Sequence, residues 1–250
     1  MKFVITDIRI PSECVAELKR RGFSPILLPP HEKLPAPVAS HTDMLIFRSG
    51  KELIASRRYL SENPKIKEAL LKIKGCALSE SDDDCGEEYP ADAIFNAAVL
   101  GNILLAKSDT VSKDILSYAE SRGLRVLHTR QGYPACTVLC IDAHHAITAD
   151  AGARRPLEDS GIDILSVNDS GAIALPPYEF GFIGGTAGVF EKTVYFAGNL
   201  NSHPDSERIV SFINNIGYEA VSLAPTLPCL VDVGGLAFID DGADEDGNDG

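Results

Sequence analysis

Residues 103–126 read ILLAKSDTVSKDILSYAESRGLRV and contain the pattern that decides the fold. The apolar run Ile103–Ser108 ends in polar residues and predicts a strand. The apolar residues that follow share one face at helical spacing: Val111, Ile115, Tyr118 and Ala119. Gly123 then stands where the end of a helix needs a residue with positive φ, and a second short apolar strand follows it. The stretch therefore predicts a strand, a helix and a strand.

The same helix–glycine–strand ending recurs five times in the chain. The glycines at these endings are Gly22, Gly75, Gly123, Gly161 and Gly217. Before each helix we expect a strand with a polar end, and these strands are Phe3–Asp7, Leu53–Ser56, Ile103–Ser108, Ala146–Asp150 and Val194–Asn199. The helix before Gly161 contains Pro156 and is expected to be short.

Four of the five units have a further strand just upstream, joined by a tight turn. The turns contain residues 49–51, 101–102, 143–144 and 191–192. The first unit begins the chain and lacks this strand, and we expect Leu230–Ile239 to supply it from the far end. The sequence thus predicts five ββαβ modules of about 45 residues, one of them split between the termini. Such a ring closes on itself and leaves no exposed sheet edge.

Two other α/β architectures compete with this interpretation. A (β/α)₈ barrel and a doubly wound sheet both require single strands that alternate with helices, and the paired strands contradict both. We therefore expect one domain over residues 1–239, followed by a disordered acidic tail over residues 240–250.

This module pattern resembles the pentein fold of the guanidino-group-modifying enzymes (GME), an α/β propeller around a pseudo-five-fold axis. That superfamily includes deiminases, dimethylarginine hydrolases, amidinotransferases and a non-catalytic ribosome anti-association factor. Two segments look like those of an uncharacterised bacterial branch of this superfamily. They are the glycine-rich segment Gly181-Phe182-Ile183-Gly184-Gly185 and the late segment Asp232-Val233-Gly234-Gly235. The resemblance implies a central channel lined by the first strand of each hairpin.

Composition excludes several classes of function. The chain has 36 acidic and 23 basic residues, a net charge of −13 that disfavours nucleic acid. Residues 80–88 and 240–250 hold six acids each and no base, so acids and bases nearly balance elsewhere. No apolar run is long enough for a membrane span, and the N-terminus MKFVITDIRI lacks a signal-peptide pattern. Six cysteines without a CxxC pair predict a reduced, cytoplasmic protein.

The spacing of the modules selects candidate site residues. Counting back eleven residues from the centres of three second strands reaches Asp43, Asp92 and Cys136, and His41 lies two residues before Asp43. In the fold that the sequence resembles, these positions would face one another in the central channel. A thiol and an imidazole in one pocket are typical of nucleophilic catalysis.

We therefore predict Cys136 as nucleophile and His41 as acid/base. The predicted substrate-binding residues are Asp43, Asp92, Asn96 and Asp232. Their carboxylates predict a small cationic or amidino-type ligand, and no cofactor or metal is expected. Cys136 and Cys140 cannot share a metal, because four residues of strand separate them by about 13 Å. A second His-x-Asp motif, at His203 and Asp205, is better explained as a helix cap.

One departure from the family pattern leaves two functions open. GME enzymes carry their nucleophilic cysteine shortly after a late glycine pair, where this chain has Gly234-Gly235-Leu236-Ala237-Phe238. Phe238 stands in its place. The chain is therefore either a cysteine-dependent hydrolase or amidinotransferase-like enzyme that uses Cys136 on an amidino or amide-like carbon, or a non-catalytic pentein that binds a ligand or another protein. The first function requires the Cys136 sulfur and the His41 ring to face one cavity within about 6 Å.

Overall fold

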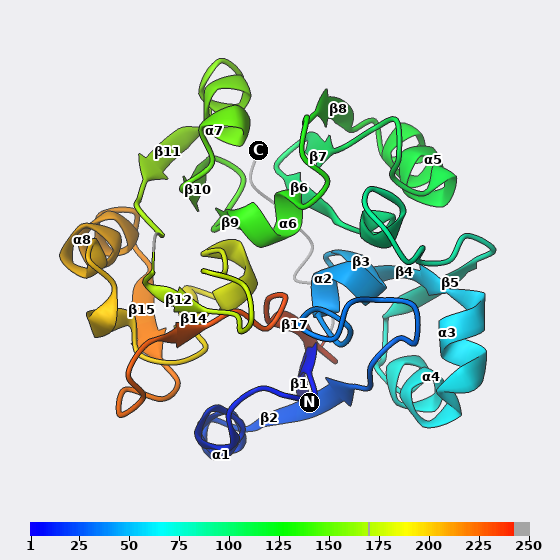
Figure 1. Ribbon diagram of the computed structural model, residues 1–250, viewed down its shortest axis with the longest axis horizontal. Coiled ribbons are helices and arrows are strands. Elements are labelled where there is room, and N and C mark those ends of the chain that lie inside the picture. The colour runs from blue at the N-terminus through cyan, green and yellow to red at the C-terminus, as the bar shows by residue number, and fades with distance from the viewer. Residues whose placement is uncertain (170, 243–250) are drawn as a thin grey trace.

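The computed structural model describes residues 1–169 and 171–242, and its sheets surround a common centre (Figure 1). Within the described residues, five sheets have three strands each. The first two sheets are β17 (Ala237–Asp240), β1 (Lys2–Asp7) and β2 (Phe23–Leu28), and β3 (Ile46–Ser49), β4 (Glu52–Ser56) and β5 (Ala77–Ser81). In each sheet the middle strand pairs antiparallel with the first strand and parallel with the third.

The other three-stranded sheets repeat this arrangement. They consist of β6 (Ala97–Leu100), β7 (Ile103–Ala106) and β8 (Arg125–His128); β9 (Val138–Cys140), β10 (His145–Thr148) and β11 (Asp163–Ser166); and β13 (Ala187–Phe190), β14 (Thr193–Phe196) and β15 (Glu219–Ser222). A small parallel pair, β12 (Ile173–Ala174) and β16 (Leu230–Val231), joins two loops. The fold is a mixed α/β fold.

Helices connect each middle strand to its parallel neighbour and lie on the outside (Figure 1). They are α1 (Ser12–Arg20), α3 (Arg57–Glu62), α4 (Pro64–Leu71), α5 (Lys113–Ser121), α7 (Ala151–Glu158) and α8 (Ser206–Asn215). Their apolar faces bury residues such as Leu18, Ile115 and Ile213 against the sheets. Burial of this kind stabilises a helix more than its intrinsic propensity does.

The glycines that end these helices adopt the backbone conformation that the sequence predicts. The φ angles of Gly22, Gly75, Gly123, Gly161 and Gly217 lie between 65° and 86°. Only glycine adopts this left-handed region without a steric cost, so the chain turns at each of these glycines toward the third strand, although α4 already ends at Leu71, before Gly75. This prediction is confirmed.

The prediction of a single strand over Leu230–Ile239 is wrong. The segment forms two short strands, β16 and β17, and only β17 pairs with β1. Gly234 and Gly235 lie between them with φ angles of 66° and 83°, and two successive left-handed residues cannot continue a strand. The chain bends at the centre of the molecule before it pairs with β1.

The prediction that the site residues open the first strand of each hairpin is also wrong. Asp43 lies in α2 (Thr42–Leu45), Asp92 in the 3₁₀ turn η1 (Ala91–Ala93) and Cys136 in α6 (Pro134–Thr137). Two further 3₁₀ turns are η2 (Gly184–Thr186) and η3 (Leu200–Ser202). A helical turn thus precedes β3, β6, β9 and β13. In α6, Pro134 at the start of the helix presets a helical φ. Figure 1 shows α2 and α6 pointing into the centre.

The two acidic segments contribute to the fold where they are described. Asp84 accepts hydrogen bonds from Lys33 and Ser56 at 2.8 Å each, and its carboxylate lies 3.0 Å from His31 Nε2. Asp240 belongs to β17 and is paired with Lys2, and the Asp241 carboxylate lies 3.6 Å from the N-terminal ammonium. The rest of the expected disordered tail, residues 243–250, lies outside the described residues.

None of the described helices has the length and apolar character needed to cross a membrane. All six cysteines are free thiols.

The left-handed glycines give a direct stability test. Gly123→Ala should lower the free energy of unfolding by about 1 kcal/mol, because alanine is strained at a φ of 65°. A Cβ at this position would meet no atom within 4 Å, so the cost is purely that of the backbone. Gly242→Ala, at an exposed glycine with an ordinary φ, is the control and should change stability by less than about 0.5 kcal/mol. Urea unfolding measures both; equal losses would contradict the assignment.

Candidate active site

The Cys136 sulfur lies in a buried hydrogen-bond network. Its S–H donates to Asp43 Oδ2 at 2.7 Å, and Asn96 Nδ2 donates to the sulfur at 3.3 Å. The Ala135 N–H donates to Asn96 Oδ1 at 2.8 Å, which fixes the side-chain amide with its nitrogen toward the sulfur. Asp43 and Asn96 therefore hold the thiol from two sides.

His41 lies beside this thiol at the start of α2. Its Nδ1 is 3.8 Å from Asp232 Oδ1 and its Nε2 is 3.9 Å from Asp7 Oδ2, and neither nitrogen has a hydrogen-bond partner among the described residues. Burial lowers the pKa of His41, although both carboxylates oppose the shift. The imidazole is therefore neutral at pH 7 and can accept a proton.

Burial controls the protonation of the other site groups. It raises the pKa of Asp43 to about 6 and that of Asp232 to about 6, because a charged carboxylate loses its hydration there. Burial also raises the pKa of the Cys136 thiol well above its ordinary value, and the Asp43 carboxylate adds to this shift. The resting thiol is therefore protonated.

A cavity of about 350 Å³, here called the thiol cavity, opens onto Cys136, His41 and Asp232. Its polar lining is His41, Asp92, Tyr133, Cys136, Tyr178, Glu179 and Asp232, and its apolar wall is Pro35, Val38, Met44, Leu175, Phe180 and Phe182. Tyr133 donates its hydroxyl to Asp92 Oδ2 at 2.7 Å. No Lys or Arg belongs to the described lining, so the cavity suits a cation with an apolar body.

Four buried polar atoms at this site lack a hydrogen-bond partner among the described residues. They are Nδ1 and Nε2 of His41, Oδ1 of Asp43 and Oδ1 of Asp92. Buried polar atoms in proteins are nearly always paired, and unpaired ones call for an explanation. The unpaired atoms of His41 and Asp92 belong to residues that line the thiol cavity, and they indicate a site that receives hydrogen-bonding groups from outside the chain.

A metal ion is sterically feasible here. His41, Asp43 and Cys136 each offer one ligand atom, and these atoms lie within 4.8 Å of one another. An imidazole, a carboxylate and a thiolate with one open position suit Zn²⁺, and binding would require the thiol to lose its proton. Without a metal, the same three side chains can bind an organic cation and react with it.

All the residues predicted for the site lie together. His41, Asp92, Cys136 and Asp232 line the thiol cavity, and Asp43 and Asn96 contact the sulfur. The roles predicted for them remain predictions. Sequence reasoning missed Asp7 and Tyr133, although the polar end of the first strand, at Asp7, was a visible signal.

Phe238 lies away from the cavity and packs in an aromatic cluster. Its ring centroid is 4.9 Å from that of Phe23, 5.1 Å from that of Tyr195 and 5.9 Å from that of Phe190. The second His-x-Asp motif lies outside the site: His203 is buried against Asp169, and its Nδ1 accepts the Asp205 N–H at the start of α8.

Comparison with solved structures places the fold among the pentein-fold enzymes. A dimethylarginine dimethylaminohydrolase from Pseudomonas aeruginosa, solved as a mutant complexed with citrulline, superimposes with a TM-score of 0.56 at 13% identity, over 90% of this chain and 92% of that one. The amidinotransferase SxtG from Microseira wollei gives a TM-score of 0.54 at 11% identity, over 97% and 94%. The N-terminal domain of ArgZ, covalently bound to a reaction intermediate, gives 0.52 at 12% identity, over 90% and 92%.

The chain thus has a mixed α/β fold similar to pentein-fold structures. It belongs to the family described as "Family of unknown function (DUF6873)", whose profile matches residues 5–237. No protein of curated function matches it by sequence.

The raised pKa of Asp43 predicts how stability depends on pH. A folded pKa of about 6 against an ordinary 3.8 means that the folded protein binds more protons between these values. The stabilisation that the protonated Asp43 carboxyl group adds to the free energy of unfolding is therefore complete below pH 4 and is lost as the pH rises to 6. Asp43→Asn cannot ionise, so its stability relative to wild type should rise by about 2 kcal/mol between pH 4 and pH 7.

Urea unfolding at several pH values measures this difference. The control is Asp163→Asn, which removes an exposed carboxylate and should show no comparable rise. A flat difference for Asp43→Asn over the same range would contradict a buried carboxylate with a raised pKa.

Proposed function

We propose that the protein is a guanidino-group-modifying enzyme of the pentein type, a cysteine-dependent hydrolase that acts on the C–N bond of a small guanidinium or amidinium compound. Five ββαβ modules around a pseudo-five-fold axis, one split between the termini, fit the repeated sheet arrangement. The observation that carries the proposal is the thiol and the imidazole on one cavity, with their reactive atoms within 4.8 Å. The free cysteines support a reducing, cytoplasmic location.

The first chemical step is attack by the Cys136 sulfur on the guanidinium carbon. The thiol proton passes to Asp43, which already accepts the S–H bond at 2.7 Å and has a pKa near neutrality. A bound cation lowers the pKa of the thiol, because its charge favours the thiolate over the neutral form. The substrate therefore activates a nucleophile that is protonated in the resting protein.

Asp43 then protonates the leaving group, and His41 activates the water. The proton that Asp43 took from the thiol passes to the departing nitrogen, the C–N bond breaks and ammonia leaves, so that a covalent amidino adduct remains on sulfur. Water adds to this adduct, His41 accepts its proton, and the carbon–sulfur bond breaks to release a urea product and restore the thiol. The net reaction converts a guanidinium ion and water into a urea and an ammonium ion.

The lining of the thiol cavity favours a substrate without a carboxylate. Asp92, Glu179 and Asp232 attract a cation, whereas no described lining residue would pair with an acid group. The apolar wall formed by Leu175, Phe180 and Phe182 suits an alkyl chain. An alkylguanidine fits this cavity better than an amino acid does.

A product assay tests the proposal. The full-length protein should convert butylguanidine to butylurea, and arginine at least tenfold less efficiently, since a carboxylate would be buried without a partner. Cys136→Ser should lower kcat/KM on the order of 10³-fold or more, and His41→Ala about a hundredfold. Mass spectrometry of the intact His41→Ala protein should find an amidino adduct on Cys136.

Cys140→Ser is the matched control, because Cys140 lies four residues further along the chain and does not line the thiol cavity. Its activity should stay within about twofold of wild type. Loss of activity in Cys140→Ser but not in Cys136→Ser, or the absence of any product and adduct, would rule out Cys136 as the nucleophile.

One observation favours the second function, a non-catalytic pentein that binds a ligand or another protein. The Cys136 thiol is buried and its pKa is raised, as expected of an inert structural cysteine. In that case butylguanidine should bind in calorimetry, and Asp232→Asn should weaken binding, without any product. The assay and the titration together separate the two functions.

A further inference from the structure

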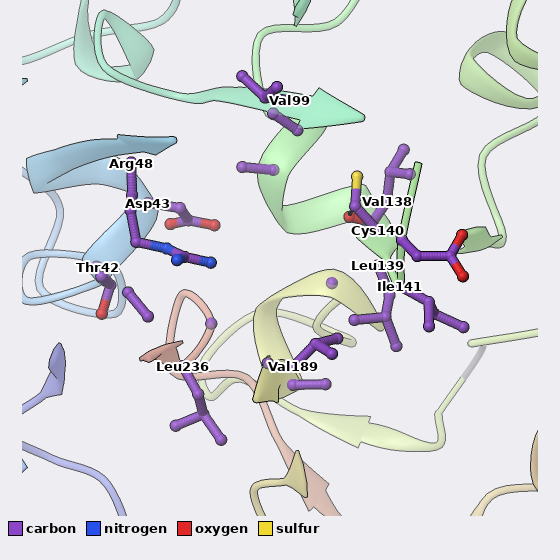
Figure 2. A pocket seen from close by; sticks show the side chains of 18 of the residues that line it. Thr42, Asp43, Arg48, Val99, Val138, Leu139, Cys140, Ile141, Val189 and Leu236 are labelled. Carbon is purple, nitrogen blue, oxygen red and sulfur yellow. Dashed lines mark hydrogen bonds between the residues drawn. The ribbon is translucent and has the colours of Figure 1, made fainter. Parts of the chain in front are cut away.

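A second cavity, of about 520 Å³, borders Asp43, one of the residues that hold the thiol. Neighbouring residues of the same segments line the two cavities: His41 and Cys136 line the thiol cavity, whereas Thr42 and Ala135 line the second. Its rim includes the hairpin-turn residues Gly50, Gly101, Asp142, Ala143 and Glu191. Figure 2 shows its walls, which include the apolar side chains of Val99, Val138, Leu139, Ile141, Val189 and Leu236.

Arg48 extends from β3 into this cavity, here called the arginine cavity (Figure 2). Its Nη1 donates to the carbonyl oxygens of Gly50 at 3.2 Å and Phe238 at 3.0 Å, which anchors the guanidinium. Within the described residues, Nε and Nη2 have no acceptor and no carboxylate forms an ion pair with the group. Burial lowers the pKa of Arg48, since a guanidinium loses part of its hydration there.

Each carboxylate that lines the arginine cavity has a partner other than Arg48, although Asp43 Oδ1 stays unpaired among the described residues. Asp43 Oδ2 accepts the Cys136 S–H bond at 2.7 Å. Asp142 Oδ1 lies 2.8 Å from His145 Nδ1, and Glu191 Oε1 lies 3.0 Å from Lys2 Nζ. The guanidinium thus keeps a planar pair of free donors inside a cavity that also has aliphatic walls, the geometry that binds a carboxylate in a bidentate manner.

We propose that the arginine cavity is a second ligand site, which binds a small organic acid through its carboxylate on Arg48 and its apolar body on the surrounding aliphatic wall. The site is separate from the proposed chemistry at Cys136 and does not depend on it. An arginine with free donors and no ion-pair partner among the described residues is costly for folding alone, because its charge is partly desolvated. A bound carboxylate supplies that counter-ion.

The carboxylate that binds Arg48 has one of two sources. It is a free organic acid, or it belongs to the acidic residues that follow Gly242. The Gly242 carbonyl accepts a bond from Lys51 Nζ at 2.6 Å, and Lys51 adjoins the rim residue Gly50. The sequence beyond contains Asp244, Glu245, Asp246 and Asp249. Both sources predict that Arg48 binds carboxylates.

Benzoate is the probe for this site. Calorimetric titration of the full-length protein should show saturable binding of benzoate and none of benzamide, its neutral counterpart of similar shape. Arg48→Met should weaken benzoate binding at least tenfold, as expected when a charge-assisted hydrogen-bonded pair is lost. Arg125→Met, at an exposed arginine of β8, removes the same charge and should leave the affinity unchanged.

A variant with Asp244→Asn, Glu245→Gln, Asp246→Asn and Asp249→Asn separates the two sources. Tighter benzoate binding than in wild type assigns the site to the chain's own acids, whereas unchanged binding assigns it to a free acid. Cys136→Ala should bind benzoate as wild type does, so failure of the proposed catalysis leaves this test intact. Benzoate affinity that is the same in Arg48→Met and wild type would overturn the proposal.

A crystal soaked with 4-bromobenzoate keeps the proposal testable if Arg48→Met does not fold. The anomalous signal of bromine should lie in the arginine cavity, with the carboxylate on the guanidinium of Arg48. Bromine found only in the thiol cavity or at the surface would overturn the proposal.

Discussion

The close approach of chain segments at the centre of the molecule is the constraint on which the rest depends. A Cβ at Gly184 would lie 2.6 Å from the carbonyl oxygens of Ala135 and Cys136, and one at Gly185 would overlap the Asp232 carboxylate. A Cβ at Gly234 would overlap His41. Since real Cβ atoms never come so close, only glycine lets these segments meet. The thiol, the imidazole and the carboxylates are neighbours because these glycines have no side chains.

This packing places ionisable groups where water cannot hydrate them. Asp43 and Asp232 have raised pKa values, and His41 has a lowered one. Desolvation makes each charged form costly, which raises the pKa of the two carboxyl groups and lowers that of the imidazole. A fold selected for stability alone would fill this space with apolar side chains. The buried polar network therefore supports a functional site, at a cost in stability.

Two different cavities lie beside this central layer. Carboxylates line both, but the described lining of the arginine cavity also contains a guanidinium with free donors, which the thiol cavity lacks. Consecutive residues of α2 and α6 belong to different cavities, because a helical turn directs successive side chains to different sides. A short helix before a first strand can thus contribute residues to both cavities.

The sequence by itself determined the repeated helix–glycine–strand endings and the paired strands, because these follow from local periodicity and from glycine's access to positive φ. That the site residues meet at the centre was expected only from the resemblance to a known fold. The sequence also selected His41, Asp43 and Cys136 through spacing between equivalent positions. Only the tertiary structure decided that Asp43 holds the thiol, that Phe238 belongs to an aromatic cluster, and that Arg48 faces a second cavity. Contacts between residues so distant in the chain depend on three-dimensional packing, which no local pattern encodes.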